Sequence, residues 1–116
     1  MSIINVAFKK TIIYYDGPQV FLAEDKEGKL YVCLWEIREE GCKWKERIIC
    51  FYFVNNEING INVDIIDADS LIDIGFIGMC DKAEEYFVGD IIDSSDSFDL
   101  KKIEKKNIAK EWLFSE

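Results

Sequence analysis

The strongest constraint on the fold is an unbroken run of seven apolar residues, Ile-Ile-Cys-Phe-Tyr-Phe-Val, at 48–54. A short run rich in β-branched and aromatic residues indicates a strand. A strand with one solvent-exposed face alternates apolar and polar residues. A strand without this alternation is therefore buried on both faces. The segment 29–35 has the same character. We therefore expect these two strands to be central, with five buried residues: Cys33, Leu34, Ile49, Phe51 and Phe53.

The residues before these strands predict an antiparallel meander. Segments 11–15 and 20–24 are short β-branched and aromatic runs, joined by Asp-Gly-Pro-Gln at 16–19. Glycine tolerates the dihedral angles of a tight turn, and proline presets φ there. The next turn, 24–29, contains another glycine and leads into the strand at 29–35. We expect the strand at 11–15 to lie at or near an edge of the sheet.

The segment 36–47 is expected to be a loop between the two central strands. If the chain turns near Gly41 and Cys42, residues whose numbers add up to about 83 lie opposite each other. Cys33 then faces Cys50, within reach of a disulfide, although a reducing compartment would keep both thiols free.

The second half predicts one short helix at 67–76, with an aspartate N-cap and a stop at Gly75, and a strand at 84–89. The C-terminal part predicts a helix over about 99–113, with one apolar face and lysines on the other. At 116 residues the chain fits a single domain, 1–116. The predicted fold class is α+β: an antiparallel meander of about five strands with a C-terminal helix packed on one face.

The stretch Tyr-Tyr-Asp-Gly-Pro through Trp-Glu, at 14–36, resembles the start of a small bacterial domain family of uncharacterised function. The resemblance rests on Tyr15, Asp16, Gly17, Pro18 and Gly28. It implies the turn, strand, hairpin and second strand already described. It implies no activity.

The residue types argue against an enzyme. The chain has no histidine, which removes the commonest general base, the histidine-activated nucleophiles and most transition-metal sites. The adjacent carboxylates at 39–40 and 84–85 would face opposite sides of a strand, so neither pair can share a substrate. The four cysteines form no Cys-x-x-Cys pair, and we expect them to be reduced, structural thiols: Cys33, Cys42, Cys50 and Cys80. We expect no cofactor.

The predicted location is the cytoplasm. No apolar run reaches the roughly 18–20 residues that span a bilayer, and the N-terminal segment lacks the order of charges and the cleavage site of a signal peptide.

The net charge of −9 is concentrated in one third of the chain. Residues 1–63 carry nine acidic and eight basic side chains, and residues 100–116 carry three acidic and five basic ones. Residues 64–99 carry eleven acidic side chains and one lysine. Within them, aspartates recur every third residue at 90–99, a spacing that suits neither face of a helix nor one face of a strand. We expect an exposed irregular loop there.

Three explanations of this acidic third remain open. It is a solvated face, partly neutralised by the C-terminal lysines. Alternatively, it docks on a basic partner and imitates a row of phosphates. The third alternative is a divalent metal site, although 64–75 places a leucine where an EF-hand loop needs an oxygen ligand. Direct binding of nucleic acid is disfavoured, because this region would repel phosphate.

The leading hypothesis is a non-enzymatic interaction module that docks on a basic, nucleic-acid-binding protein surface. By analogy with other small acidic proteins, it would act as an inhibitor: an immunity protein against a toxin nuclease, or a phage anti-defence protein that blocks a nucleic-acid-guided effector, as an anti-CRISPR protein does. The alternative is a small calcium- or ligand-binding accessory domain, and an enzyme ranks third. Trp44 either folds back over the sheet edge or anchors the partner. The candidate contact residues are Asp64, Asp67, Asp69, Asp73, Asp81, Glu84, Glu85, Asp90, Asp93, Asp96 and Trp44.

Overall fold

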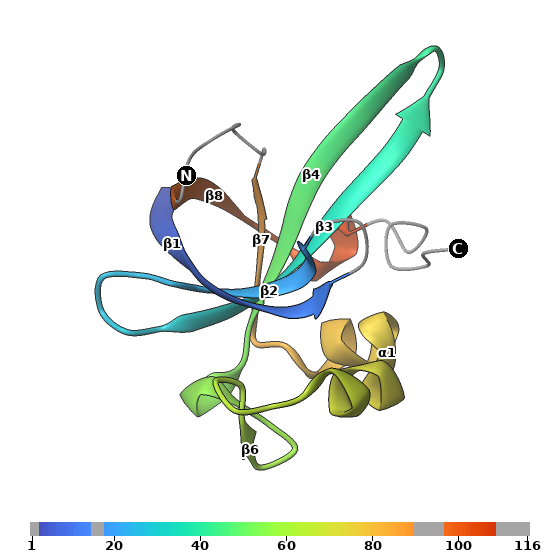
Figure 1. The fold of residues 1–116 in the computed structure, drawn as a ribbon. Coiled ribbons are helices and arrows are strands. Elements are labelled where there is room, and N and C mark those ends of the chain that lie inside the picture. Colours follow the sequence, from blue (N-terminus) through green and yellow to red (C-terminus); the bar gives the residue numbers. More distant parts are fainter. Residues whose placement is uncertain (1–2, 15–17, 90–96, 109–116) are drawn as a thin grey trace.

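The structure, a computed structural model, describes residues 3–14, 18–89 and 97–108, without the side chains of residues 18, 37–40 and 43–45. Six antiparallel strands form a closed barrel in the order β1-β2-β3-β4-β7-β8 (Figure 1). Their bounds are β1 Ile3–Tyr14, β2 Pro18–Glu24, β3 Leu30–Glu40, β4 Lys43–Tyr52, β7 Glu85–Gly89 and β8 Ser97–Ile103. Between β4 and β7 lie the 3-10 helix η1 (Val54–Asn56), the strand pair β5 (Glu57–Ile58) and β6 (Ile61–Asn62), and the helix α1 (Ala68–Lys82). The 3-10 helix η2 (Lys105–Asn107) follows β8.

Barrel closure contradicts the predicted open meander of about five strands. β1 pairs with β2 on one side and with β8 on the other, where Ile4 lies opposite Leu100. Among the described residues, 11–14 pair with β2 alone, since β8 pairs only with residues 3–7, so the expected edge position of this segment is confirmed over its described part. β1 begins at Ile3, well before the predicted strand, and register shifts along its pairing with β2 mark bulges. Bulges increase twist and bending, which lets one long strand pair with two neighbours around a barrel.

The predicted C-terminal helix is also wrong over the described residues. Segment 97–103 is the closing strand β8, in which Phe98 and Leu100 are buried and Asp99 and Lys101 are exposed. This alternation has the period of a strand. Leu100 and Ile103 are three residues apart, a spacing that also fits one face of a helix. The local sequence pattern therefore predicted a helix where the chain forms a strand. The remainder of the predicted helix, 109–113, lies outside the described residues.

The strands β2, β3 and β4 are covered on both faces, which confirms the prediction made for 29–35 and 48–54. One cluster of buried side chains takes members from all six barrel strands and fills the interior: Val6, Phe21, Ala23, Tyr31, Cys33, Ile48, Cys50, Phe87, Phe98 and Leu100. A second cluster lies outside the barrel, where α1 and residues 53–66 cover β2–β4. The five residues expected to be buried are all buried.

The predicted register of the central strands is confirmed. Cys33 lies opposite Cys50, and Glu40 opposite Lys43. The chain turns at Gly41, whose φ is 67°, a conformation that glycine adopts without strain in a two-residue hairpin turn. The segment 36–47 is therefore a continuous ladder and not a loop, and Figure 1 shows this hairpin extending beyond the barrel.

The predicted helix cap is confirmed, and Gly75 ends the first helical segment as predicted, but the segment that follows it was not predicted. The side chain of Asp67 accepts a hydrogen bond from the Ser70 backbone N–H at 2.8 Å, as an N-cap does. Gly75 interrupts the helix, with φ 77° and ψ 159°, but a second helical segment continues to Lys82. Leu71, Met79 and Cys80 are buried against the outer layer of the core.

Candidate functional site

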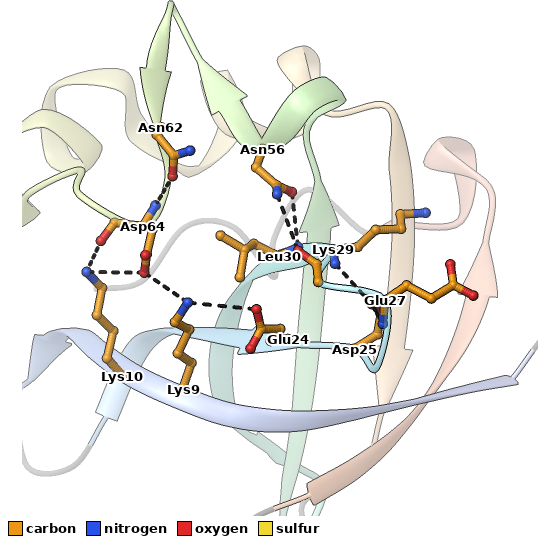
Figure 2. A network of polar contacts seen from close by, with 11 residues as sticks. Lys9, Lys10, Glu24, Asp25, Glu27, Lys29, Leu30, Asn56, Asn62 and Asp64 are labelled. Atoms are coloured by element: carbon orange, nitrogen blue, oxygen red, sulfur yellow. Dashed lines mark hydrogen bonds and ion pairs between the residues drawn. The ribbon is translucent and has the colours of Figure 1, made fainter.

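Some of the predicted acidic residues are held by lysines of the barrel. Asp64 lies beside β1, where its Oδ1 is 3.4 Å from Lys9 Nζ and 3.7 Å from Lys10 Nζ (Figure 2). Lys10 also donates a hydrogen bond to the Asp64 backbone carbonyl. This aspartate therefore ties the segment before α1 to the barrel, which is a structural role.

Two further acidic residues are also paired. Asp81, near the end of α1, has its Oδ1 2.9 Å from Lys105 Nζ. Glu85, the first residue of β7, lies between Lys29 and Lys102 at one end of the barrel. Neither residue contributes uncompensated charge to a common acidic patch.

Asp69, Ile72 and Asp73 point outward from the first segment of α1, because positions three and four apart share one face of a helix. Among the described residues, neither aspartate has an ion-pair partner. Ile72 is 60% exposed, and Ile65, just before the Asp67 cap, is 76% exposed. We call these four residues, Ile65, Asp69, Ile72 and Asp73, the α1 face.

The other predicted contact residues do not join the α1 face. Asp67 caps the helix, and its hydrogen bonds with Ser70 lower the pKa of its carboxyl. Glu84 is exposed beyond the far end of α1, where its backbone N–H donates to the Tyr52 carbonyl. Trp44 lies within β4, opposite Glu39, and not in a loop as expected. Asp90, Asp93 and Asp96 lie outside the described residues.

The calcium alternative gains no support from the described part of the chain. There, no group of three carboxylate or cysteine side chains is arranged to hold a metal ion. The aspartates of 64–75 are instead engaged with lysines, cap the helix or point outward.

A charged cluster that was not predicted from the sequence lies at the barrel end where β2, β4 and β8 finish. Glu85 Oε1 is 3.1 Å from Lys29 Nζ, and Glu85 Oε2 is 2.7 Å from Lys102 Nζ. Glu85 alternates with Phe87, and Lys102 with Leu100, on the interior face of their strands. Hydrogen bonds from Lys102 and then Lys29 outweigh partial burial and lower the pKa of Glu85. Partial burial alone would lower the pKa of Lys29, but the hydrogen bond to Glu85 raises it.

Aromatic side chains surround this cluster. Lys29 Nζ lies 4.2 Å from the centre of the Tyr52 ring, a cation–π contact. The Tyr31 hydroxyl donates to Asp25 Oδ2 at 2.9 Å, and burial together with this bond raises the pKa of Tyr31. Tyr31 meets the ring of Phe87 edge-on, with ring centres 5.3 Å apart.

The turn above the cluster is fixed by two polar side chains. Asp25 Oδ1 accepts hydrogen bonds from the backbone N–H groups of Glu27 and Lys29, at 2.9 and 3.0 Å. Asn56 accepts from the Leu30 N–H and donates to the Gly28 carbonyl (Figure 2). The β2–β3 turn is thereby held in one position over the barrel end.

A pocket of about 730 Å³ opens at this barrel end. Apolar β1 residues line one side, the Lys29, Glu85 and Lys102 cluster lines another, and Tyr31 and Phe87 also contribute. The only sequence signal was a charged residue alternating with apolar ones at 85–87 and 100–102. That signal has meaning only once both segments are known to be barrel strands.

Among the described residues, no helix is long and apolar enough to cross a membrane. The cytoplasmic location and the family resemblance of 14–36 stay predictions. Comparison with models of known protein families, with curated proteins and with solved structures gives no significant match.

Proposed function

We propose that the protein is a non-enzymatic interaction module that docks on a basic protein surface through the α1 face. The observation that carries this proposal is that the strongly exposed Ile72 shares one face of α1 with Asp69 and Asp73, which have no cationic partner among the described residues. Ile65, just before the Asp67 cap, is strongly exposed as well. Asp64, Asp81 and Glu85 are each paired with lysines, whereas Asp69 and Asp73 have no such pair among the described residues.

Apolar side chains flanked by charge are typical of protein contact surfaces. Burial of an isoleucine against a partner releases water from its apolar surface and contributes affinity. Charged groups at the rim contribute more to the encounter rate and to partner choice. The α1 face offers both, on a helix anchored by Leu71, Met79 and Cys80.

The charge of the face selects the class of partner. Basic side chains would pair with Asp69 and Asp73, and the chain's overall charge of −9 would attract such a partner over a longer range. Surfaces that bind nucleic acid are basic because they contact phosphates. A toxin nuclease or a nucleic-acid-guided effector is therefore the partner that we propose, with the protein as its inhibitor.

The test is a quantitative capture from host lysate at low salt with three forms of the protein as bait. These are wild type, Asp69→Asn/Asp73→Asn, and Glu27→Gln/Glu46→Gln. The last is matched in charge and replaces one exposed carboxylate on the β2–β3 turn and one within β4, in the hairpin that extends away from α1 in Figure 1. We expect a basic protein that wild type and the matched control retain and the Asp69/Asp73 variant loses.

The captured protein must also contact the apolar part of the α1 face. Ile72→Ser, which removes apolar area and keeps all charges, should speed its dissociation. If wild type and the Asp69/Asp73 variant capture the same proteins in equal amounts, the α1 face is only a solvated surface and the proposal is wrong.

A further inference from the structure

We infer that the pocket at the barrel end is a binding site for a small organic carboxylate with an apolar body. The proposal concerns a second site, at the mouth of the barrel interior and not on the outer face covered by α1. It does not rest on the proposed function.

The position of the charged cluster points to a ligand. Lys102 and Glu85 occupy positions that face the barrel interior, next to Leu100 and Phe87. Interior-facing positions of small barrels are normally filled by apolar side chains, and the mouth is where such barrels hold one small ligand. Here three charged side chains stand at the mouth, above an apolar interior.

Donors make up the larger part of the spare hydrogen-bonding capacity of the cluster. A lysine ammonium has three N–H donors, and a carboxylate has none. Lys29 and Lys102 are each in hydrogen-bonding distance of one oxygen of Glu85, so two ammonium groups share one carboxylate. These three side chains carry a net charge of +1. A second carboxylate, supplied by a ligand, would neutralise this charge and accept hydrogen bonds from both lysines.

Two of the three other carboxylates that line the pocket already have donors, and the third, Glu27, is exposed on the β2–β3 turn next to Lys26. Asp25 accepts two backbone N–H groups and the Tyr31 hydroxyl. Glu24 forms an ion pair with Lys9, with 3.8 Å between Oε2 and Nζ. Because these acceptors are occupied, an incoming cation would find fewer unsatisfied partners at the pocket wall than an incoming anion.

The walls favour an apolar body behind the anionic group. Ile3, Ile4 and Ala7 line the β1 side, and Tyr31 and Phe87 are the aromatic contribution from β3 and β7. A volume of about 730 Å³ lies in the range of small-molecule sites, roughly 300–1,000 Å³. A planar acid such as an arylacetate would place its ring on these walls and its carboxylate between the two lysines.

The experiment titrates the isotope-labelled, full-length protein with phenylacetate and follows its amide and methyl resonances. Phenylacetamide, neutral and of the same shape, and phenethylamine, a cation, are the comparison probes. We expect saturable shifts for phenylacetate at Ile4, Phe87 and Lys102, and at least about tenfold weaker binding of both comparison probes, since a charge-assisted hydrogen bond is lost.

Two pairs of variants separate a binding role from a structural one. Lys102→Gln should weaken phenylacetate binding about tenfold, whereas Lys101→Gln, next to it on the opposite face of β8, should leave it unchanged. Glu85→Gln should strengthen binding about five- to tenfold, because it removes the internal carboxylate that competes for both lysines. Glu84→Gln makes the same change in net charge outside the pocket and should have no effect.

The opposite signs at Lys102 and Glu85 make the inference refutable, since mere loosening of the barrel end would weaken binding in both variants. The inference is overturned if phenylacetate gives no saturable shift, if the amide or the amine binds as tightly, or if Glu85→Gln weakens binding.

Discussion

Phe51→Ala tests the two-layer core. Phe51 is fully buried in the outer layer, on the face of β4 opposite to Cys50. Its ring meets Phe53 and Tyr86 edge-on, with ring centres 6.3 and 6.0 Å apart. Truncation removes the transfer free energy of the ring, leaves a cavity under α1 and loses both aromatic contacts. The free energy of unfolding should fall by about 3–5 kcal/mol.

The assay is equilibrium unfolding in urea, followed by tryptophan fluorescence and by circular dichroism. Tyr14→Ala is the control, because Tyr14 is 72% exposed and its loss should cost less than about 1 kcal/mol. A loss below about 1 kcal/mol for Phe51→Ala would show that β4 is not covered on its outer face, and the two-layer core would be wrong.

Three further predictions concern stability. All four cysteines are free, and the thiols of Cys33 and Cys50 are buried in the barrel interior. Addition of reductant should therefore leave the melting temperature unchanged. A drop of several degrees would reveal a structural disulfide. The pKa of Glu85 is lowered in the folded state, so its contribution is present above the unfolded pKa of about 4.3 and is lost as the pH falls through the folded value. The difference in unfolding free energy between wild type and Glu85→Gln should be about 1 kcal/mol at pH 7 and shrink toward zero near pH 2–3, and a difference that grows on acidification would contradict the ion pairs. Gly75→Ala should cost about 1–3 kcal/mol by thermal or urea unfolding, because the backbone there has φ 77° and ψ 159°, a region almost exclusive to glycine; an unchanged stability would show that α1 is not broken at this residue.

Sequence reasoning succeeded where the deciding interactions are local. The unbroken apolar run at 48–54 required cover on both faces, and Gly41 fixed the hairpin that sets Cys33 opposite Cys50. The aspartate before α1 had the side chain and position of an N-cap, and it caps the helix. Each of these features depends on residues within one hairpin or one helical turn.

Closure of the barrel was not predictable in this way. It depends on β1 pairing with β8, in which Ile4 and Leu100 lie almost the whole chain apart. The spacing of Leu100 and Ile103 fits a helix as well as a strand, and only the partner strand decides between them. The closure then determines which charged residues face the interior, so the pocket at Glu85 and Lys102 was missed as well.

The acidic third illustrates the same limit for charge. Composition located the excess charge in 64–99, but the lysines that neutralise Asp64 come from β1, and the one beside Asp81 follows β8. These contacts are non-local. They divide a region that looked continuous in sequence, and on α1 they leave Asp69 and Asp73 without an ion-pair partner among the described residues.

The most direct test of the account is the association rate of the captured basic partner with three forms of the protein: wild type, Asp69→Asn/Asp73→Asn and Glu27→Gln/Glu46→Gln. Rates are measured by stopped flow at about 20 mM and at about 500 mM salt, because screening removes long-range attraction at the higher concentration. We predict that at low salt the Asp69/Asp73 variant associates several-fold more slowly than both wild type and the matched control, and that all three rates converge at high salt. Equal rates for the Asp69/Asp73 variant and the matched control at low salt would contradict the account, because the α1 face would then contribute no more than any other exposed charge.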